Sequence, residues 1–265
     1  MKNLFSIEGK TALITGGSRG IGEMIAAGFL ANGAKVYISS RKADVLEATA
    51  ERMAQEFGGD CTALPADLSG MAGIEGLAGA LAEHEERLDI LVNNAGAAWG
   101  APLDEFPESG WDKVMDTLVR GVFFLTQKLL PLLRAAATAQ DPARVINVGS
   151  IDGIKTPAFE NFSYCPSKAA VHHLTRVLAA NLVRQHILVN AIAPGPFPTW
   201  MLSTGVGFGG QVEGQDWDRV GADNPSGRVG TMEDIAGLAI FLSSRAGAYT
   251  VGETITCDGG VVACS

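Results

Sequence analysis

Short β-rich segments alternate with longer helical segments along the whole chain. The predicted strands cover residues 10–15, 34–39, 61–66, 88–93, 143–148, 187–193 and 253–258. Helices are predicted between them, over 21–32, 42–57, 71–84, 111–135, 164–184 and 232–243. Because neighbouring parallel strands need long crossover connections, this order predicts a parallel sheet with helices on both faces. We therefore expect an α/β fold, with a doubly wound parallel seven-stranded sheet, in a single domain spanning residues 1–265.

The charge of the chain limits the partners that it can take. A formal net charge of −9 argues against a nucleic acid or an anionic membrane surface as a main partner. The N-terminus lacks a signal-peptide pattern, and no apolar run reaches the roughly 18 residues that span a membrane. The four cysteines show no C-x-x-C spacing, which favours a reducing compartment. We expect a cytoplasmic protein with a small-molecule partner, and the scattered histidines predict no metal site.

The stretch "TALITGGSRGIG" runs a predicted strand directly into a glycine-rich turn and then a helix. Glycines there let the backbone approach a pyrophosphate, whose charge is stabilised by the free N–H groups at the helix N-terminus. A glycine turn by itself is a weak signal, but its place after the first strand favours a Rossmann-like nucleotide site. The spacing of Gly16, Gly20 and Gly22 differs from the usual G-x-G-x-x-G pattern.

Seven motifs in order along the chain resemble those of the short-chain dehydrogenase/reductase family. They are "TGGSRGIG", "ADL" at 66–68, "NNAG" at 93–96, "NVGS" at 147–150, Tyr164-x-x-x-Lys168, "PGPFPT" at 194–199 and "DGG" at 258–260. The segments "GWDKVM", "LLPLLRAAA" and "AGAYTVG" further resemble the family's rhamnolipid-associated 3-oxoacyl reductase subgroup. The family resemblance implies a dehydrogenase or reductase of the classical type that binds a nicotinamide dinucleotide, and it implies a homotetramer with the 111–135 and 164–184 helices as contact surfaces.

The end of the second predicted strand bears on the choice between NAD and NADP. An acidic side chain there bonds a ribose 2′-hydroxyl, whereas a cation accommodates a 2′-phosphate. Ser39 and Ser40 carry no carboxylate, Arg41 follows them, and Arg19 lies in the glycine turn. Two guanidinium groups suit a phosphate, so we predict NADP(H). The alternative is that Arg41 and Lys42 only solvate the start of a helix.

The resemblance implies a full set of cofactor-binding residues. They are Gly16, Gly17, Ser18, Arg19, Gly20, Ile21, Gly22, Arg41, Asp67, Leu68, Asn94, Ala95, Gly96, Tyr164, Lys168, Pro194, Gly195, Phe197 and Thr199.

Ser150, Tyr164 and Lys168 are the predicted catalytic residues. Hydride transfer to a ketone builds negative charge on its oxygen, so the site needs a proton donor and a second hydrogen bond at that atom. Tyr164 and Lys168 lie one helical turn apart on one face, and a nearby ammonium group is expected to lower the pKa of the phenol. Ser150, at the end of a strand, is expected to hold the carbonyl oxygen. Taken singly, each is more often a packed or solvated structural residue.

One position departs from the family pattern. The family usually has an asparagine three residues before the glycine of the segment "LVRG", and Leu118 stands there instead. The family asparagine is thought to hold a water that carries protons to the lysine, and leucine cannot bond it. This leaves an alternative function, a relative that binds NADPH with weak or no turnover and acts as a sensor or a subunit.

The predicted substrate residues are Trp99, Asp152, Phe159, Trp200 and Met201. Several of these are aromatic, and the Gly- and Pro-rich segment 194–230 is long enough to be a lid over a ligand. We predict an NADPH-dependent oxidoreductase that transfers a hydride between the cofactor and the carbonyl or secondary alcohol of a largely apolar substrate. A 3-oxoacyl chain, a cyclic ketone or a steroid would fit. The alternative is that these aromatic residues anchor loops.

Overall fold

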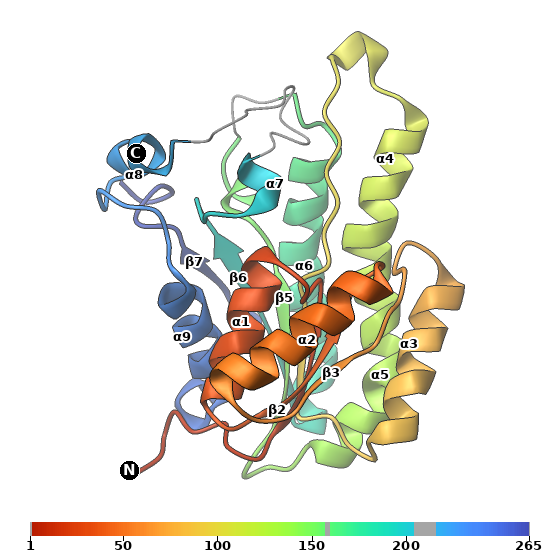
Figure 1. Ribbon diagram of the computed structural model, residues 1–265. Coiled ribbons are helices and arrows are strands. Elements are labelled where there is room, and N and C mark those ends of the chain that lie inside the picture. Colours follow the sequence, from red (N-terminus) through yellow and green to blue (C-terminus); the bar gives the residue numbers. More distant parts are fainter. Residues whose placement is uncertain (1, 157–159, 204–215, 265) are drawn as a thin grey trace.

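A computed structural model of the chain describes residues 2–156, 160–203 and 216–264. Its centre is a seven-stranded parallel sheet in the order β3-β2-β1-β4-β5-β6-β7 (Figure 1). The strands are β1 (Thr11–Thr15), β2 (Lys35–Ser39), β3 (Cys61–Ala63), β4 (Ile90–Asn93), β5 (Ala143–Val148), β6 (Ile187–Pro194) and β7 (Thr254–Cys257). The predicted fold class is therefore confirmed, and each predicted strand matches an observed one.

Helices cover both faces of the sheet. The helices of the described residues are α1 (Gly20–Ala31), α2 (Ala43–Phe57), α3 (Met71–His84), α4 (Glu108–Met115), α5 (Gly121–Ala136), α6 (Tyr164–Leu182), α7 (Trp200–Ser203), α8 (Trp217–Ala222) and α9 (Met232–Ser243). Short 3₁₀ turns lie at Leu103–Glu105, Ile151–Gly153, Val183–Gln185 and Arg245–Gly247. No helix within the described ranges combines the length and the apolar character needed to cross a membrane.

The two faces of the sheet are built from alternate strand residues. Ala12 and Ile14 of β1 pack with α1, α2 and α9 on one face, whereas Leu13 packs with α3, α5 and α6 on the other. Strand side chains point alternately to the two faces, so a strand buried on both is apolar throughout. All five residues of β1 and all six of β5 are buried, which is why these segments stood out in the sequence.

The predicted helix over 111–135 is confirmed as one helical run over 108–136, with a π-helical turn in its middle. The chain forms α4, then a π-helix, η2, over Asp116–Arg120, and then α5. Gly121, the first residue of α5, packs closely on the Leu68 carbonyl, where an added Cβ would lie 2.9 Å from the oxygen. The π-helical turn is a local feature that often occurs at functional sites.

Within segment 194–230 the structure contains α7 and α8, so its described part is helical in two places and not a plain loop. Residues 204–215 of the segment predicted as a lid, 194–230, lie outside the described residues.

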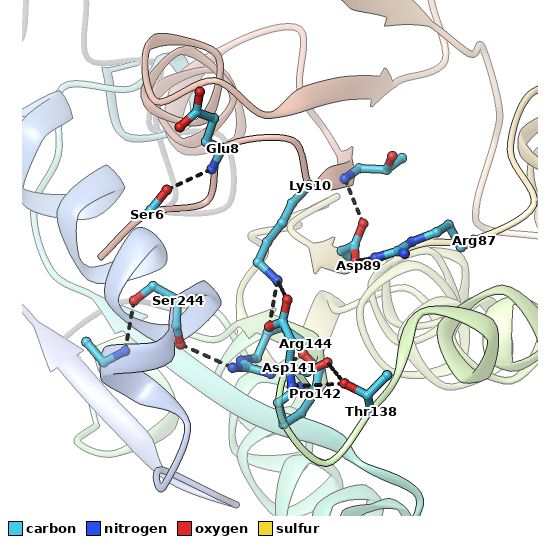
Figure 2. A network of polar contacts seen from close by, with 12 residues as sticks. Ser6, Glu8, Lys10, Arg87, Asp89, Thr138, Asp141, Pro142, Arg144 and Ser244 are labelled. Atoms are coloured by element: carbon cyan, nitrogen blue, oxygen red, sulfur yellow. Dashed lines mark hydrogen bonds and ion pairs between the residues drawn. The ribbon is translucent and has the colours of Figure 1, made fainter. Parts of the chain in front are cut away.

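A polar network lies at the amino ends of the central strands (Figure 2). The Arg144 side chain, in a residue only 1% exposed, donates to the carbonyl oxygens of Leu242 and Ser244, each at 3.1 Å, and also to that of Pro142. Burial lowers the pKa of this guanidinium group. Near it, the Lys10 ammonium pairs with the Asp141 carboxylate at 2.7 Å. The network ties β5 to the C-terminal end of α9. It therefore lies on the side of the sheet away from the carboxyl ends of the strands.

Replacing Arg144 by methionine should destabilise the fold. The substitution keeps an apolar stem of similar length but leaves the helix-end carbonyl groups without donors, and each buried unsatisfied acceptor costs about 1–3 kcal/mol. We expect a loss of about 2–4 kcal/mol, which lowers the melting temperature by roughly 5–12 °C in a chain of this size. Arg134→Met, at an exposed arginine whose side chain donates to the Gln185 side chain at 2.8 Å, is the matched control. Equal melting temperatures for the two variants in a thermal scan would contradict the role assigned to the network.

Candidate active site

A cavity of about 810 Å³ lies at the carboxyl ends of the strands. It is lined by the glycine turn after β1, the ends of β2, β4, β5 and β6, the start of α6 and the start of α7. Strand order reverses between β1 and β4, and ligands of open α/β sheets bind at such a reversal. The position of the cavity in the fold therefore favours a nucleotide ligand.

Most predicted cofactor-binding residues line this cavity. They are Gly16, Ser18, Arg19, Gly20, Ile21, Arg41, Asp67, Leu68, Asn94, Ala95, Gly96, Tyr164, Lys168, Pro194, Gly195, Phe197 and Thr199. Gly17 and Gly22 are not among the lining residues. Instead they pack inward, where an added Cβ would overlap Ile38 at Gly17 and Asn94 at Gly22.

Asn94 joins the end of β4 to the glycine turn. Its amide nitrogen Nδ2 donates to the carbonyl oxygen of Thr15 at 2.9 Å and to that of Gly16 at 3.3 Å. The Thr15 hydroxyl accepts from the backbone N–H groups of Asn94 and Ala95, both at 2.9 Å. Gly16 itself has φ = +67°, which a residue with a Cβ rarely adopts. The turn is thus held open toward the cavity by backbone geometry and by β4.

The end of β2 presents polar groups to the same cavity. The hydroxyl oxygens of Ser39 and Ser40 are buried and have no hydrogen-bond partner among the described residues. Arg41 follows them, and its charge helps to lower the pKa of the Asp67 carboxyl, together with the larger effect of hydrogen bonds from Ser69. Buried polar groups normally have partners, so unpartnered hydroxyls at the edge of a cavity suit a polar ligand. This corner therefore fits the adenosine end of a dinucleotide.

Ser150, Tyr164 and Lys168 meet at the cavity from two elements. Ser150 follows β5, while Tyr164 and Lys168 lie in the first turns of α6. Pro166 is tolerated between them because the first turn of a helix needs no intrahelical N–H donors. The Tyr164 phenol interacts with the Ser150 side chain, and the Ser150 hydroxyl accepts from the backbone N–H of Asp152 at 3.1 Å. The three residues predicted as catalytic are therefore brought together.

Lys168 is buried, and its ammonium group donates to the carbonyl oxygen of Val148 at 2.8 Å. The ammonium nitrogen lies 5.4 Å from the centre of the Tyr164 ring. Burial lowers the pKa of Lys168 to about 8, and the Asp152 charge partly opposes this. Lys168 is therefore mostly charged at neutral pH and loses its charge at a lower pH than an exposed lysine does.

The pKa of the Tyr164 phenol lies above its ordinary value. Burial is the main cause, the negative charge of Asp152 adds to it, and the interaction with Ser150 opposes it. The prediction that Lys168 lowers the pKa of this phenol is not borne out, because burial and the Asp152 charge raise that pKa and Lys168 is not among the groups that shift it. The phenol stays protonated at neutral pH, which is the state that a proton donor needs.

Sequence reasoning missed His172, which lies one turn after Lys168 on α6. Its ring is buried and accepts from the backbone N–H of Ser150 through Nε2 at 3.4 Å. Burial lowers its pKa to about 4, so the ring is neutral and can accept. Gly149 and Gly153 leave room for the ring, since a Cβ at either position would overlap it or crowd it. In the sequence, the two glycines of "NVGSIDG" are the sign that space is left there for a packed side chain.

A buried row of polar side chains supports the same elements. Asn93 donates through Nδ2 to the Asn147 amide oxygen at 2.9 Å and to the Thr126 hydroxyl at 3.1 Å. Asn147 in turn donates to the Thr175 hydroxyl at 2.9 Å. These bonds join β4 and β5 to α5 and α6 directly behind the cavity. Fully satisfied buried networks of this kind rigidify the structure around them.

Three of the predicted substrate residues, Asp152, Trp200 and Met201, line the cavity. Trp99 is not among the lining residues. It packs against Gly110, and the Lys113 ammonium lies 5.1 Å from its ring centre, so it anchors a loop to α4. Phe159 lies outside the described residues.

Leu118 lies in the π-helical turn η2 and is 1% exposed. The side chain is packed and is not among those that line the cavity, whereas the neighbouring Thr117 does line it. The Thr117 hydroxyl donates to the Lys113 carbonyl oxygen at 2.8 Å. The departure at position 118 therefore places an apolar group behind the site and leaves a hydroxyl at its surface.

The chain matches known proteins over almost its full length. A family model described as enoyl-(acyl carrier protein) reductase matches residues 16–262. The rhamnolipids biosynthesis 3-oxoacyl-(acyl-carrier-protein) reductase of Pseudomonas aeruginosa is 51% identical over 98% of this chain and 99% of that protein. The short-chain dehydrogenase/reductase PhomF of Diaporthe leptostromiformis is 31% identical over 97% of this chain and 93% of that protein.

Solved structures show the same likeness. The Pseudomonas aeruginosa RhlG/NADP active-site complex has a TM-score of 0.90 and 50% identity, covering 98% of this chain and 99% of that one. L-sorbose reductase from Gluconobacter frateurii, complexed with NADPH and L-sorbose, has a TM-score of 0.88 and 28% identity, covering 99% and 100%. The resemblance stated from the motifs is therefore confirmed, and the chain belongs to the short-chain dehydrogenase/reductase family of oxidoreductases.

Proposed function

We propose that this chain is an NADPH-dependent ketoreductase, which transfers a hydride between the nicotinamide cofactor and a carbonyl or secondary alcohol. The observation that carries the proposal is the meeting of Ser150, Tyr164 and Lys168 at a cavity that begins at the glycine turn. A proton donor, an oxygen-binding hydroxyl and a buried cation are the groups that hydride transfer to a ketone requires.

Several features of the cavity support NADPH as the cofactor. Gly16 and Gly20, with φ of +67° and +60°, let the backbone approach a pyrophosphate at the start of α1. Arg19 and Arg41 line the same cavity as the unpartnered hydroxyls of Ser39 and Ser40. Two relatives of known structure are described as complexes with NADP and with NADPH. Cations together with hydroxyl groups suit a 2′-phosphate better than a 2′-hydroxyl.

The bound dinucleotide would supply the hydride, and the chain's own residues would do the rest. Ser150 would donate a hydrogen bond to the substrate carbonyl oxygen and fix its position. The Tyr164 phenol, kept protonated by burial, would give its proton to that oxygen as negative charge develops. The Lys168 ammonium, 5.4 Å from the ring, would stabilise the phenolate that remains.

The substrate is proposed to be largely apolar. Trp200, Met201, Leu202 and Val220 lie on the side of the cavity formed by α7 and α8. A 3-oxoacyl compound is the first candidate, because the Pseudomonas aeruginosa relative is described as a 3-oxoacyl reductase. Cyclic ketones and steroid-like ketones remain in the proposal. The homotetramer, with α5 and α6 as contact surfaces, and the cytoplasmic location stay predictions.

The direct test is NADPH oxidation, followed by the loss of nicotinamide absorbance, with a panel of ketones. The panel holds a 3-oxoacyl thioester, a cyclic ketone, a steroid ketone and a keto-sugar as the polar comparison. We expect turnover with at least one apolar ketone and a lower Michaelis constant for NADPH than for NADH. A preference for NADH, or turnover of the keto-sugar alone, would overturn the corresponding part of the proposal.

Leu118 favours a second candidate function, a family relative that binds NADPH with weak or no turnover and serves as a sensor or a subunit. Tight NADPH binding without oxidation of any ketone would support it. The intact set of Ser150, Tyr164 and Lys168 favours the reductase, because losing a proton relay weakens one step but keeps the reactants positioned.

Leu118→Asn should raise turnover. If a proton supply to Lys168 limits the wild-type rate, an amide at this buried position restores a group that can bind water, and we expect kcat to rise at least about threefold. Leu118→Ala is the matched control, because it opens the same space without adding a polar group. An equal kcat for Leu118→Asn and the wild type in steady-state assays would refute the relay argument.

A further inference from the structure

The contact that carries a further inference joins the glycine turn to α7. The guanidinium carbon of Arg19 lies 4.1 Å from the centre of the Trp200 ring, which places the cation on the face of the indole. Both residues line the cavity, and Trp200 is 49% exposed. The two residues are far apart in the sequence, so the contact depends on the fold alone. Such contacts are stabilising, and more strongly so where water is excluded.

The path of the chain after β6 supports the same contact. Thr199, just before Trp200, lies over Gly20, where an added Cβ would be 3.3 Å from its methyl carbon. The Thr199 hydroxyl accepts from the backbone N–H of Leu202 at 3.3 Å, which closes the single turn of α7. Trp200 is therefore held above the glycine turn by its own helix and by its neighbour.

The contact with Trp200 leaves the N–H groups of the Arg19 guanidinium available to bind an anion. A guanidinium group uses its face for aromatic contacts and its edge for hydrogen bonds, so a face held by an indole keeps the N–H groups available. No ion pair between described residues involves Arg19, so no carboxylate there competes for them. A long, flexible side chain loses rotamer freedom when it binds, and prior ordering reduces that loss.

We propose that Trp200 is a positioning residue that holds Arg19 in place for the 2′-phosphate of NADP(H), so that α7 on the substrate side contributes to cofactor choice. This inference rests on the proposed NADPH preference and extends it. It assigns the preference to three residues, Arg19, Arg41 and Trp200, and not only to the two cations. It also explains why an exposed tryptophan stands at the mouth of the cavity.

The test uses two ligands that differ by one phosphate, 2′,5′-ADP and 5′-AMP, measured by isothermal titration calorimetry on the whole protein. For Trp200→Leu we expect the dissociation constant for 2′,5′-ADP to rise about 2- to 12-fold, because Arg19 would then lose its rotamer freedom only on binding. The value for 5′-AMP should stay within twofold. Trp200→Phe keeps an aromatic face and should recover most of the affinity. Trp111→Leu, at a partly exposed tryptophan of α4 outside the cavity lining, is the matched control and should change neither value.

The double variant Arg19→Leu/Trp200→Leu distinguishes the proposed role from direct stacking of Trp200 on the ligand. If Trp200 acts through Arg19, the double variant should bind 2′,5′-ADP no more weakly than Arg19→Leu alone. Additive losses, or an equal loss for 5′-AMP, would overturn the inference while leaving the proposed function in place. If the wild type binds both ligands equally, the NADPH preference itself fails, and that outcome is separate from a flat result for Trp200→Leu.

In steady-state kinetics Trp200→Leu should raise the ratio of the Michaelis constant for NADPH to the Michaelis constant for NADH. Because Trp200 also lines the substrate side of the cavity, this ratio is the readout and kcat is not. An unchanged ratio would overturn the positioning role.

Discussion

Tyr164→Phe should lower kcat for ketone reduction by about a thousandfold, because it removes the proton donor while keeping the ring that packs at the start of α6. Binding of 2′,5′-ADP should stay within twofold of the wild-type value, since the phenol has no part in holding the adenosine end. The measurements are steady-state kinetics with the best ketone of the panel and calorimetry with 2′,5′-ADP.

Tyr249→Phe removes a phenol hydroxyl from an exposed residue and is the matched control. It should leave kcat unchanged. A Tyr164→Phe variant that keeps more than about a tenth of the wild-type kcat would show that another group gives the proton, because general acids usually contribute a hundredfold or more. Such a result would remove Tyr164 from the mechanism while leaving the nucleotide site intact.

Lys168 should impose a basic limb on the pH profile. Its pKa is lowered to about 8 by burial, so the ammonium is present below that pH and is lost as the pH rises through it. The profile of kcat/KM reports ionisations in the free enzyme, and we expect a plateau below about pH 8 and a fall of about tenfold per pH unit above it. Lys168→Met should lower kcat/KM at pH 7 by about a hundredfold or more, because the developing phenolate loses its cation.

Two further variants test whether the basic limb of the pH profile belongs to Lys168. Asp152 raises the pKa of Lys168, so Asp152→Asn should move the basic limb to lower pH. Lys168→Arg keeps its charge at every accessible pH and should remove the limb even where activity is reduced. A limb that stays at the same pH in both variants would assign it to a group other than Lys168.

The layers of the fold could be predicted because each strand that is buried on both faces is a short apolar run. The bounds of α3 (Met71–His84) and α9 (Met232–Ser243) agree with the prediction for the same reason, since their apolar faces pack on the sheet. The π-helical turn at Asp116–Arg120 was missed because the apolar spacing that predicts a helix does not separate an α-helical turn from a π-helical one.

The site shows the same division between local and tertiary information. Ser150, Tyr164 and Lys168 were found from motifs and helical spacing. The direction of the Tyr164 pKa shift could not be predicted in this way, because it depends on how deeply the fold buries the phenol and on the charge of Asp152. Trp99 could not be placed either, since its packing against Gly110 requires the position of α4. The contact of Arg19 with Trp200 joins the glycine turn to α7 and is visible only in three dimensions.

The most direct test of the proposed hydride transfer uses NADPH deuterated at nicotinamide C4, with mass spectrometry of the alcohol formed from the ketone panel. When the deuterium is on the face of nicotinamide C4 from which the hydride leaves, we expect the wild type to place one deuterium on the carbinol carbon of the product. Tyr164→Phe should give a product yield reduced about a thousandfold. Alcohol that forms without label from either deuterated face, or equal labelled product from both proteins, would contradict it.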